Sequence, residues 1–322
     1  IYEKIYSKVI SGAEAKGGVA LAIFNWARSV GDRVSDCKLA GEPVPIGLGL
    51  QYRVATKLVF SKVHAAMGGR VRWCISGAAP LNPSIGKFFH AVGIPIFEGI
   101  GMTENTSFTN LNRHDNYRFG WVGPPGPGIE QKVAEDGEVL YRGRNVMKEY
   151  YKMPAETAET LTADGWQHTG DLGEIDEENF LRITGRKKDL IITAGGKNIA
   201  PSAIEGLIAT SKYIAQVCAI GDQKPYLVAL ITVDGDNIKA FAEERGIEET
   251  DVAKLITNET IIGLIDKELG AKNAELASYE TIKKFRLVEE FSIENGLLTP
   301  TLKVKRNVAM ERYEALIDEM YT

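Results

Sequence analysis

The stretch RVRWCISGAAPLNPSIGKFFHAVGIPIFEGIGMTE, residues 70–104, decides the fold. Its composition predicts a strand over residues 70–76, a helix over 82–92 and a second strand over 94–98. Such alternation of strands and helices is typical of a parallel α/β sheet. Each strand runs into a glycine-containing segment at the carboxyl edge of the sheet, which is where open α/β sheets bind ligands.

These two segments carry the first candidate ligand-binding groups. Gly77, Ala78 and Ala79 are small enough for a flat ligand or a phosphate to approach the backbone. In the second segment, the Thr103 hydroxyl can bond a phosphate oxygen, and Glu104 can hold Mg²⁺, which takes one or two carboxylates plus substrate phosphates. The alternative is that Thr103 starts a helix and Glu104 is an acid favoured by the helix dipole.

Upstream, the sequence predicts helices. The first ~45 residues have a helical pattern with two glycine-containing breaks, and residues 51–67 place apolar side chains on one face at helical spacing. Gly68 and Gly69 can end this helix. We therefore expect a packed helical scaffold before the first strand.

Downstream, the pattern changes twice. Residues 117–184 contain short strands separated by turns, typical of a small β-barrel or β-rich subdomain, and residues 185–188 are interpreted as a linker. From Asp189 we expect a small α+β unit, with a helix opened by Pro201, two apolar strands and several helices. The last helix presents an apolar stripe that should dock on the sheet of this unit: Ala309, Tyr313, Leu316, Ile317 and Met320.

Composition excludes several classes of protein. The 322 residues are 44% hydrophobic, enough for roughly two domains, and the interspersed net charge of −5 leaves no footprint for a nucleic acid. No run approaches the ~20 apolar residues of a membrane span. Cys37, Cys74 and Cys218 have no metal-site spacing and are interpreted as reduced cytosolic thiols. The chain begins at Ile1 without a recognisable leader, so we expect a piece of a longer protein.

The segment WQHTGD, residues 166–171, adds a candidate ribose ligand. A carboxylate only accepts hydrogen bonds and a diol can donate twice, so Asp171 suits two adjacent ribose hydroxyls. His168 is interpreted as a structural residue, because the sequence ties no nucleophile to it.

Three further segments carry cations. In GRKKD, Arg186 can reach a ribose or phosphate and Asp189 can serve as a hinge, although such a basic run is usually a solvated turn. The GGKN loop, residues 195–198, lacks the spacing of a Walker loop. TPTLKVKR, residues 299–306, is predicted to be an extended basic loop that leads into the last helix.

The order of these motifs is more specific than any one of them. GAAP, EGIGMTE, WQHTGD, GRKKDL, GGKNIAP and TPTLKVKR together resemble the adenylate-forming superfamily, and most closely the long-chain fatty acyl-CoA synthetases. The resemblance implies the C-terminal part of a large domain, residues 1–188, with an α/β portion (1–116) and a β-rich subdomain (117–188). It further implies a small mobile lid domain, residues 189–322.

The resemblance also implies a role for each matching residue. ATP, Mg²⁺, CoA and a long-chain fatty acid are the expected ligands, with the acid adenylated first and then transferred to CoA. The adenine and acyl pocket is expected to be lined by Gly77, Ala78, Ala79, Glu98, Gly99, Ile100 and Gly101. Thr103 should contact phosphate, and Glu104 should bind Mg²⁺. Asp171 and Arg186 should hold the ribose, and Asp189 should be the hinge. Lys303 should meet the reacting carboxylate and α-phosphate, and the CoA tunnel should be entered by Gly195, Gly196, Lys197 and Asn198.

Two departures qualify the resemblance. Ile100 stands where the family has an aromatic residue on adenine, and a Ser/Thr/Gly-rich phosphate loop is missing from the sequence. We therefore expect the 322-residue chain to be inactive by itself. A fatty acyl-AMP ligase that serves a carrier protein and a non-catalytic nucleotide-binding relative remain the alternatives. A cytoplasmic location is expected, with peripheral membrane association left open.

Overall fold

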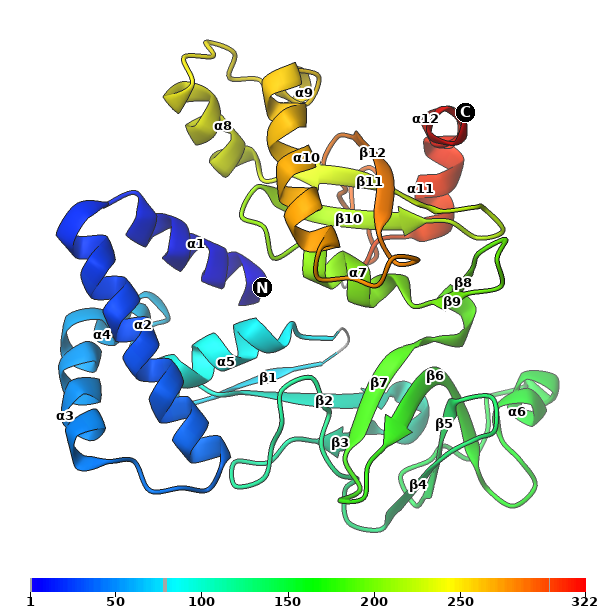
Figure 1. Cartoon of the computed structure of the whole chain (residues 1–322). Helices are drawn as coiled ribbons and strands as arrows, with labels where there is room; N and C mark the ends of the chain where they lie inside the picture. Colours follow the sequence, from blue (N-terminus) through cyan, green and yellow to red (C-terminus); the bar gives the residue numbers. More distant parts are fainter. Residues whose placement is uncertain (1, 78–79, 301) are drawn as a thin grey trace. The chain divides into compact units, whose positions relative to one another are not determined.

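The computed structural model describes residues 2–77, 80–300 and 302–322, so the predicted pocket residues Ala78 and Ala79 lie outside the described residues. The chain separates into two compact units, Ile1–Lys188 and Asp189–Thr322 (Figure 1). Among the residues described, no helix combines the length and apolarity needed to cross a membrane.

The first unit begins with a helical layer. Its helices are α1 (Tyr2–Glu14), α2 (Gly18–Leu39), α3 (Ile46–Ala55), α4 (Ser61–Ala66) and α5 (Pro83–Val92). The predicted helix over 51–67 is interrupted by a five-residue π-helical segment, η1 (Thr56–Phe60). The apolar faces of these helices share one core, in which Ala27, Phe60 and Phe89 are almost fully buried.

Helix α5 illustrates how local sequence sets the boundaries. The Asn82 side chain caps its first turn by accepting from the Ser84 N–H at 2.9 Å, and Pro83 occupies the first helical position. Gly93 ends the helix in the left-handed conformation, with φ of 91°. The helix therefore starts and stops close to its predicted limits.

The α/β portion contains a three-stranded sheet in the order β1-β2-β3, formed by β1 (Cys74–Ser76), β2 (Ile96–Met102) and β3 (Ser107–Leu111). Strands β1 and β2 are parallel as predicted, whereas β3 returns antiparallel to β2. The first strand is shorter than residues 70–76, and the second continues beyond Glu98. As a result, Gly99 and Ile100 are strand residues rather than part of a loop.

The β-rich part of this unit is an antiparallel sheet in the order β4-β5-β6-β7. Its strands are β4 (Ile129–Val133), β5 (Glu138–Gly143), β6 (Gln167–Ile175) and β7 (Leu181–Arg186), with helix α6 (Pro154–Thr160) between β5 and β6. Within the described residues, no ladder joins β4 to β7, so the sheet is open there. The linker prediction for 185–188 was wrong at its start, because Gly185 and Arg186 pair with Leu172 and Asp171.

The second unit has a central sheet in the order β10-β11-β12 and a small β8-β9 hairpin. Its strands are β8 (Ile191–Ile192), β9 (Asn198–Ile199), β10 (Ile214–Ile220), β11 (Leu227–Val233) and β12 (Ile282–Leu287). Its helices are α7 (Pro201–Ile208), α8 (Gly235–Glu244), α9 (Val252–Leu255), α10 (Glu259–Asn273), α11 (Arg306–Arg312) and α12 (Glu314–Tyr321). Strand β12 was not predicted from the sequence.

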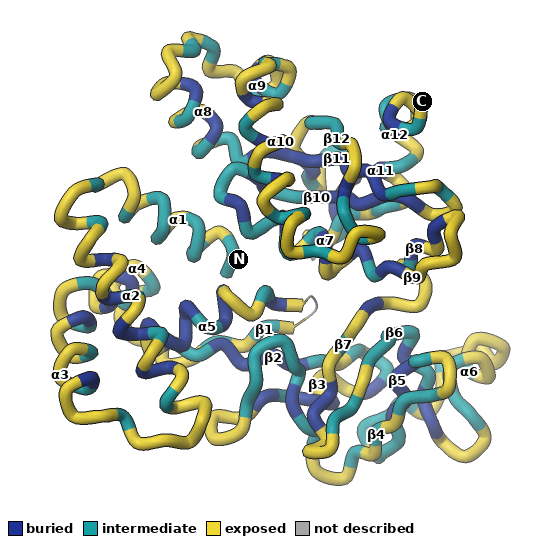
Figure 2. The backbone as a smooth tube through the Cα atoms, viewed as in Figure 1, coloured by how far each residue is buried: buried dark blue, intermediate teal, exposed yellow. Residues whose placement is uncertain are grey.

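The central strand β11 is buried along its whole length (Figure 2). Alternate residues enter two different cores, since Ala229 packs with helices α7, α8 and α10 and Leu230 packs with α11 and α12. The predicted terminal stripe joins the second core through Ala309, Ile317 and Met320. That stripe is carried by two helices, because the helical segment breaks at Tyr313.

Candidate nucleotide-binding site

Two glycines of the predicted adenine pocket, Gly99 and Gly101, have no room for a side chain. A Cβ on Gly99 would lie 2.8 Å from Leu111 Cδ1, and one on Gly101 would overlap the Ser107 carbonyl oxygen. A Cβ on Gly77 would lie 3.4 Å from the Gly99 oxygen and from the ring of Phe108. The close approach of β2 and β3 therefore explains Gly99 and Gly101 on packing grounds, whereas the contacts at Gly77 are ordinary van der Waals distances.

Glu98 is buried, with 6% of its surface exposed. Its Oε1 accepts from the Gly120 N–H at 2.9 Å and its Oε2 accepts from the Leu81 N–H at 3.4 Å. Burial raises the pKa of Glu98 to about 7, against the opposing effect of these two donors. Both carboxylate oxygens are thus used to hold the backbone around the end of β1 and the loop after β3.

Ile100 packs against a cluster that contains Val139, Tyr141 and Leu181. The Tyr141 hydroxyl donates to Asn110 Oδ1 at 2.6 Å, and Gln167 Nε2 lies 3.1 Å from Met102 Sδ. These contacts bring the EGIGMTE segment against the strand that carries WQHTGD. No periodic pattern indicates this packing, because the contacting residues lie far apart along the chain.

Thr103 and Glu104 form the short 3-10 turn η2 (Thr103–Asn105) directly after β2. Thr103 is exposed, and Glu104 Oε1 accepts from the Tyr150 hydroxyl at 2.8 Å. The buried Asn105 closes the turn by accepting from the Met102 N–H at 2.9 Å. Sequence reasoning missed Asn105 and Tyr150, which position the two predicted residues.

A magnesium ion at Glu104 would have a single protein carboxylate. No group of three or more His, Cys, Asp or Glu side chains in the described parts of the chain is arranged to hold a metal ion by itself. That donor set fits Mg²⁺ bound together with substrate phosphates, because this ion usually takes one or two carboxylates and fills its remaining positions with phosphate and water. The hydrogen bond from Tyr150 would keep the carboxylate oriented.

Asp171 and Arg186, the predicted ribose ligands, lie opposite each other on β6 and β7. Arg186 Nε is 3.0 Å from Asp171 Oδ1, and the exposed fractions are 17% for the aspartate side chain and 52% for the arginine. The Asp171 N–H donates to Thr169 Oγ1 at 3.0 Å, which fixes the backbone at this point. The pair therefore presents an oriented carboxylate with a half-exposed cation beside it.

His168 belongs to a structural network, in keeping with its interpretation from sequence. Its Nδ1 is 3.0 Å from Glu138 Oε2, and the same carboxylate accepts from the Gly170 N–H at 2.8 Å and from Lys187 Nζ at 3.2 Å. Burial alone would raise the pKa of Glu138, but these three donors outweigh it and hold the pKa below its ordinary value.

The remaining predicted residues lie in the second unit. Asp189 is exposed in the turn η3 (Lys187–Asp189). Gly195, Gly196 and Lys197 lie in the turn of the β8-β9 hairpin, where the Lys197 N–H donates to Thr193 Oγ1 at 3.2 Å, and Asn198 begins β9. Lys303 is exposed in a tight turn rather than an extended loop, since Leu298 and Val304 pair as a bridge and the Lys303 N–H donates to Thr299 Oγ1 at 3.0 Å.

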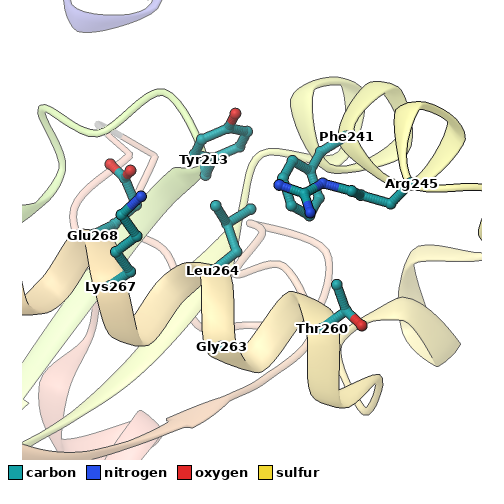
Figure 3. A pocket seen from close by; sticks show the side chains of 8 residues that line it. All are labelled: Tyr213, Phe241, Arg245, Thr260, Gly263, Leu264, Lys267 and Glu268. Atoms are coloured by element: carbon teal, nitrogen blue, oxygen red, sulfur yellow. The ribbon is translucent and has the colours of Figure 1, made fainter.

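The second unit also has a shallow pocket of about 370 Å³ between α8 and α10 (Figure 3). Its floor contains Leu264 and Gly263, and Arg245 lies against the ring of Phe241. Glu268, at its rim, accepts from the Ser211 hydroxyl at 2.7 Å. None of the predicted site residues lines this pocket.

Comparison with known proteins decides the family. Residues 47–151 match the family described as AMP-binding enzyme, and residues 188–322 match the AMP-binding enzyme C-terminal domain. This chain belongs to the AMP-binding enzyme family. The two matched regions contain most of the predicted site, from Gly77 to Glu104 in the first and from Asp189 to Lys303 in the second.

Two relatives in the AMP-binding enzyme family have names that state an activity. The chain is 36% identical over its whole length to the long-chain-fatty-acid–CoA ligase FadD15 of Mycobacterium bovis and 33% identical to the peroxisomal long chain acyl-CoA synthetase 6 of Arabidopsis thaliana. It covers 53% and 47% of those proteins, so the chain spans about half the length of the curated relatives it matches.

A solved structure supports the fold. The adenylation domain of a carboxylate reductase from Mycobacterium chelonae superposes with a TM-score of 0.67 at 24% identity, covering 92% of this chain and 45% of that one. The AMP-binding enzyme fold described above is therefore that of part of an adenylation domain.

Proposed function

We propose that this chain is the C-terminal half of a long-chain fatty acid–CoA ligase. The observation that carries the proposal is the 36% identity that extends along the entire chain to a relative with that name. The presence of Glu104, Asp171, Arg186 and Lys303 supports it, because each has a side chain of the chemical type that adenylation requires. Residues 1–188 then form the end of the large domain, and residues 189–322 form the mobile lid.

The first half-reaction joins the acid to AMP. A fatty acid carboxylate oxygen attacks the α-phosphorus of ATP, the bond to the bridging oxygen breaks, and pyrophosphate leaves with that electron pair. Asp171 would accept from the ribose hydroxyls, and Arg186 would hold the carboxylate in place or contact the sugar itself. Thr103 would donate to a phosphate oxygen. Glu104 would hold Mg²⁺, which supplies positive charge against the phosphate oxygens when bound.

Lys303 suits a contact that must form and then be released. Its ammonium is a compact charge on a flexible stem, and its backbone is fixed by the Thr299 turn. Placed beside the carboxylate and α-phosphate, it would stabilise the negative charge that develops on the non-bridging oxygens. Rotation of the lid about Asp189 would then withdraw Lys303 and bring the loop from Gly195 to Asn198 toward the reacting centre.

The second half-reaction transfers the acyl group. The CoA sulfur attacks the carbonyl carbon of the acyl adenylate, a thioester forms, and AMP leaves as the phosphate oxygen recovers its electron pair. The thiol proton passes to solvent or to the leaving phosphate. A cytoplasmic location would supply the ATP and CoA that this chemistry needs, and peripheral association with a membrane would give access to long-chain acids.

The test is acyl-CoA formation from ATP, Mg²⁺, CoA and palmitate by a longer protein that contains this chain, beside the 322-residue chain alone. We expect thioester from the longer protein and no turnover from the chain. Release of acyl adenylate without thioester would instead favour transfer to a carrier protein. Absence of pyrophosphate release with every acid tested would reject the ligase function.

A further inference from the structure

A mostly buried ion pair joins two distant segments of the second unit. Glu205 lies on α7, and Arg306 begins α11 three residues after Lys303. Arg306 Nη2 is 2.8 Å from Glu205 Oε1, and only 24% of the arginine side chain and 18% of the glutamate side chain are exposed. The partners lie 101 positions apart, so only folding brings them together.

The ion pair is bound to the edge of the central sheet at Ala219. The Ala219 N–H donates to Glu205 Oε1 at 2.8 Å, and Arg306 Nη1 donates to the Ala219 carbonyl. Among the described strands, β10 lies at the edge of its sheet. The two side chains therefore take both backbone groups of one edge residue, as a neighbouring strand would, and fix α7 and α11 to the same point of β10 (Figure 1).

The charges around Arg306 favour this arrangement. Burial by itself would lower the pKa of Arg306, but the negative charge of Glu205, with a smaller influence from the expected hinge residue Asp189, outweighs it and raises the pKa above its ordinary value. A buried ion pair is costly to break, because removal of one partner leaves an uncompensated charge in the interior. Arg306 is therefore a firm attachment point for the segment before it.

That segment is the turn that carries Lys303. The Thr299 N–H donates to the Lys303 carbonyl at 2.8 Å, and Val304 packs in the core shared with α11 and α12. Leu302 has a φ of 62°, a left-handed conformation that leucine keeps only where the surrounding structure imposes it. The turn therefore depends on its attachments, and Arg306 supplies the one at its C-terminal end.

We propose that Glu205 and Arg306 are positioning residues for Lys303: their ion pair at Ala219 sets the direction in which the Lys303 turn leaves the sheet. The inference rests on the proposed function, because that function places the Lys303 ammonium at the reacting carboxylate and α-phosphate. Glu205 and Arg306 act through Lys303 and need no contact with a substrate. The pair also joins the lysine turn to α7, the helix that follows the β8-β9 hairpin, so the two elements reorient as one body when the lid rotates.

Conservative variants test this role. Glu205→Gln keeps an oxygen for the Ala219 N–H but removes the charge. Arg306→Lys keeps the charge but loses the forked guanidinium that bonds two partners at once. Glu268→Gln is the matched control, because Glu268 is also a half-buried helical carboxylate that accepts a hydrogen bond, from the Ser211 hydroxyl at 2.7 Å. Its helix, α10, packs in the other core of the unit.

The first experiment measures amide hydrogen exchange in the 322-residue chain. We expect Glu205→Gln and Arg306→Lys to speed exchange of the Lys303 and Lys305 amides about 10-fold or more, because the turn opens more often when its attachment is weakened. The amides of β11 should keep their protection, and Glu268→Gln should leave the turn unchanged. Unchanged exchange at the turn, equal loss of protection along β11, or equal acceleration in Glu268→Gln would overturn the proposal.

The second experiment follows the two half-reactions in the longer protein. Glu205→Gln should lower the maximal rate of acyl adenylate formation about 10-fold and leave the KM for ATP unchanged, since a small displacement of a reacting group is costly in the transition state. Thioester formation from supplied acyl adenylate, which does not use Lys303, should change less than about 2-fold. Glu268→Gln should affect neither half-reaction.

A double variant separates positioning from a general structural role. In a Lys303→Ala background, Glu205→Gln should change the rate of adenylate formation less than about 2-fold, because the group that it positions is absent. The same loss with and without Lys303, or an equal loss in both half-reactions, would reject the positioning role and leave the ligase function intact. If the longer protein forms no acyl adenylate, the ligase function fails, and the exchange experiment still decides whether the ion pair holds the turn.

Discussion

Asp171 and Arg186 face each other across β6 and β7, with 3.0 Å between Arg186 Nε and Asp171 Oδ1. The two residues are fifteen positions apart and belong to different motifs, yet the strand register makes them one unit. Sequence motifs alone would treat them as independent ligands, whereas the pairing means that a change at one alters the orientation of the other.

We predict that Asp171→Ala weakens AMP binding by about 10- to 100-fold, because the ribose hydroxyls lose a charged acceptor worth about 1.5–3 kcal/mol. Arg186→Ala should have a smaller effect, since the guanidinium is half-exposed. Glu174→Ala is the control, because Glu174 forms a similar cross-strand pair with Arg182, at 2.6 Å, outside the predicted site. Calorimetric titration with AMP measures all three, and equal effects of Asp171→Ala and Glu174→Ala would contradict the ribose assignment.

Glu98 should make stability depend on pH. Burial raises its pKa from 4.5 to about 7, so the folded state binds a proton that the unfolded state has released. The unfolding free energy should therefore fall as pH rises from about 4.5 to 7, by on the order of 3 kcal/mol if Glu98 acted alone. Glu98→Gln removes this titration, so denaturant melts at several pH values should show a flatter profile for the variant. Parallel profiles would contradict the assignment.

Gly101→Ala should destabilise the first unit by about 3 kcal/mol or more, because a Cβ would overlap the Ser107 carbonyl and neither strand can move away freely. Gly49→Ala is the matched control in the same unit. A Cβ at that helical position meets nothing within 4 Å, so the change should stabilise by about 0.5–1 kcal/mol. We expect the two substitutions to change the free energy of unfolding in opposite directions in urea denaturation. A similar change in both variants would refute this packing argument.

Lys303→Ala should lower the rate of acyl adenylate formation by about 10²–10³-fold in the longer protein, which corresponds to the loss of one transition-state contact. Folding should be unaffected, because the side chain is exposed and the turn is held by backbone groups. Pyrophosphate exchange measures the first half-reaction, and thioester formation from supplied acyl adenylate measures the second. A loss confined to the second half-reaction would contradict the proposed role.

The strand-helix-strand order around α5, the two apolar strands of the second unit and the terminal stripe followed from local patterns. Alternating burial and capping signals such as Asn82 and Gly93 are written in short segments, so they are readable without a structure. Strand β12 was missed because its sequence, Ile-Lys-Lys-Phe-Arg-Leu, is mostly charged and its pairing with β11 is long-range. Only tertiary context makes such a segment a strand.

In the candidate site, too, some residues could be predicted from local sequence and others depended on tertiary context. Residues named by motifs, such as Glu104 and Asp171, could be found in the sequence. Their partners could not, because Tyr150 lies 46 positions from Glu104 and reaches it only through folding. The linker assignment for 185–188 failed for a related reason: a basic run looks like a solvated turn, although Gly185 and Arg186 complete a ladder with β6.

The two cores on either side of β11 have a practical consequence. A sheet covered on both faces by its own helices needs no further surface to become a cooperative folding unit. Lys188 is exposed at the junction, so brief digestion with trypsin should cleave there and release Asp189–Thr322 as a protease-resistant piece. That piece would be small enough for residue-by-residue assignment by nuclear magnetic resonance in solution.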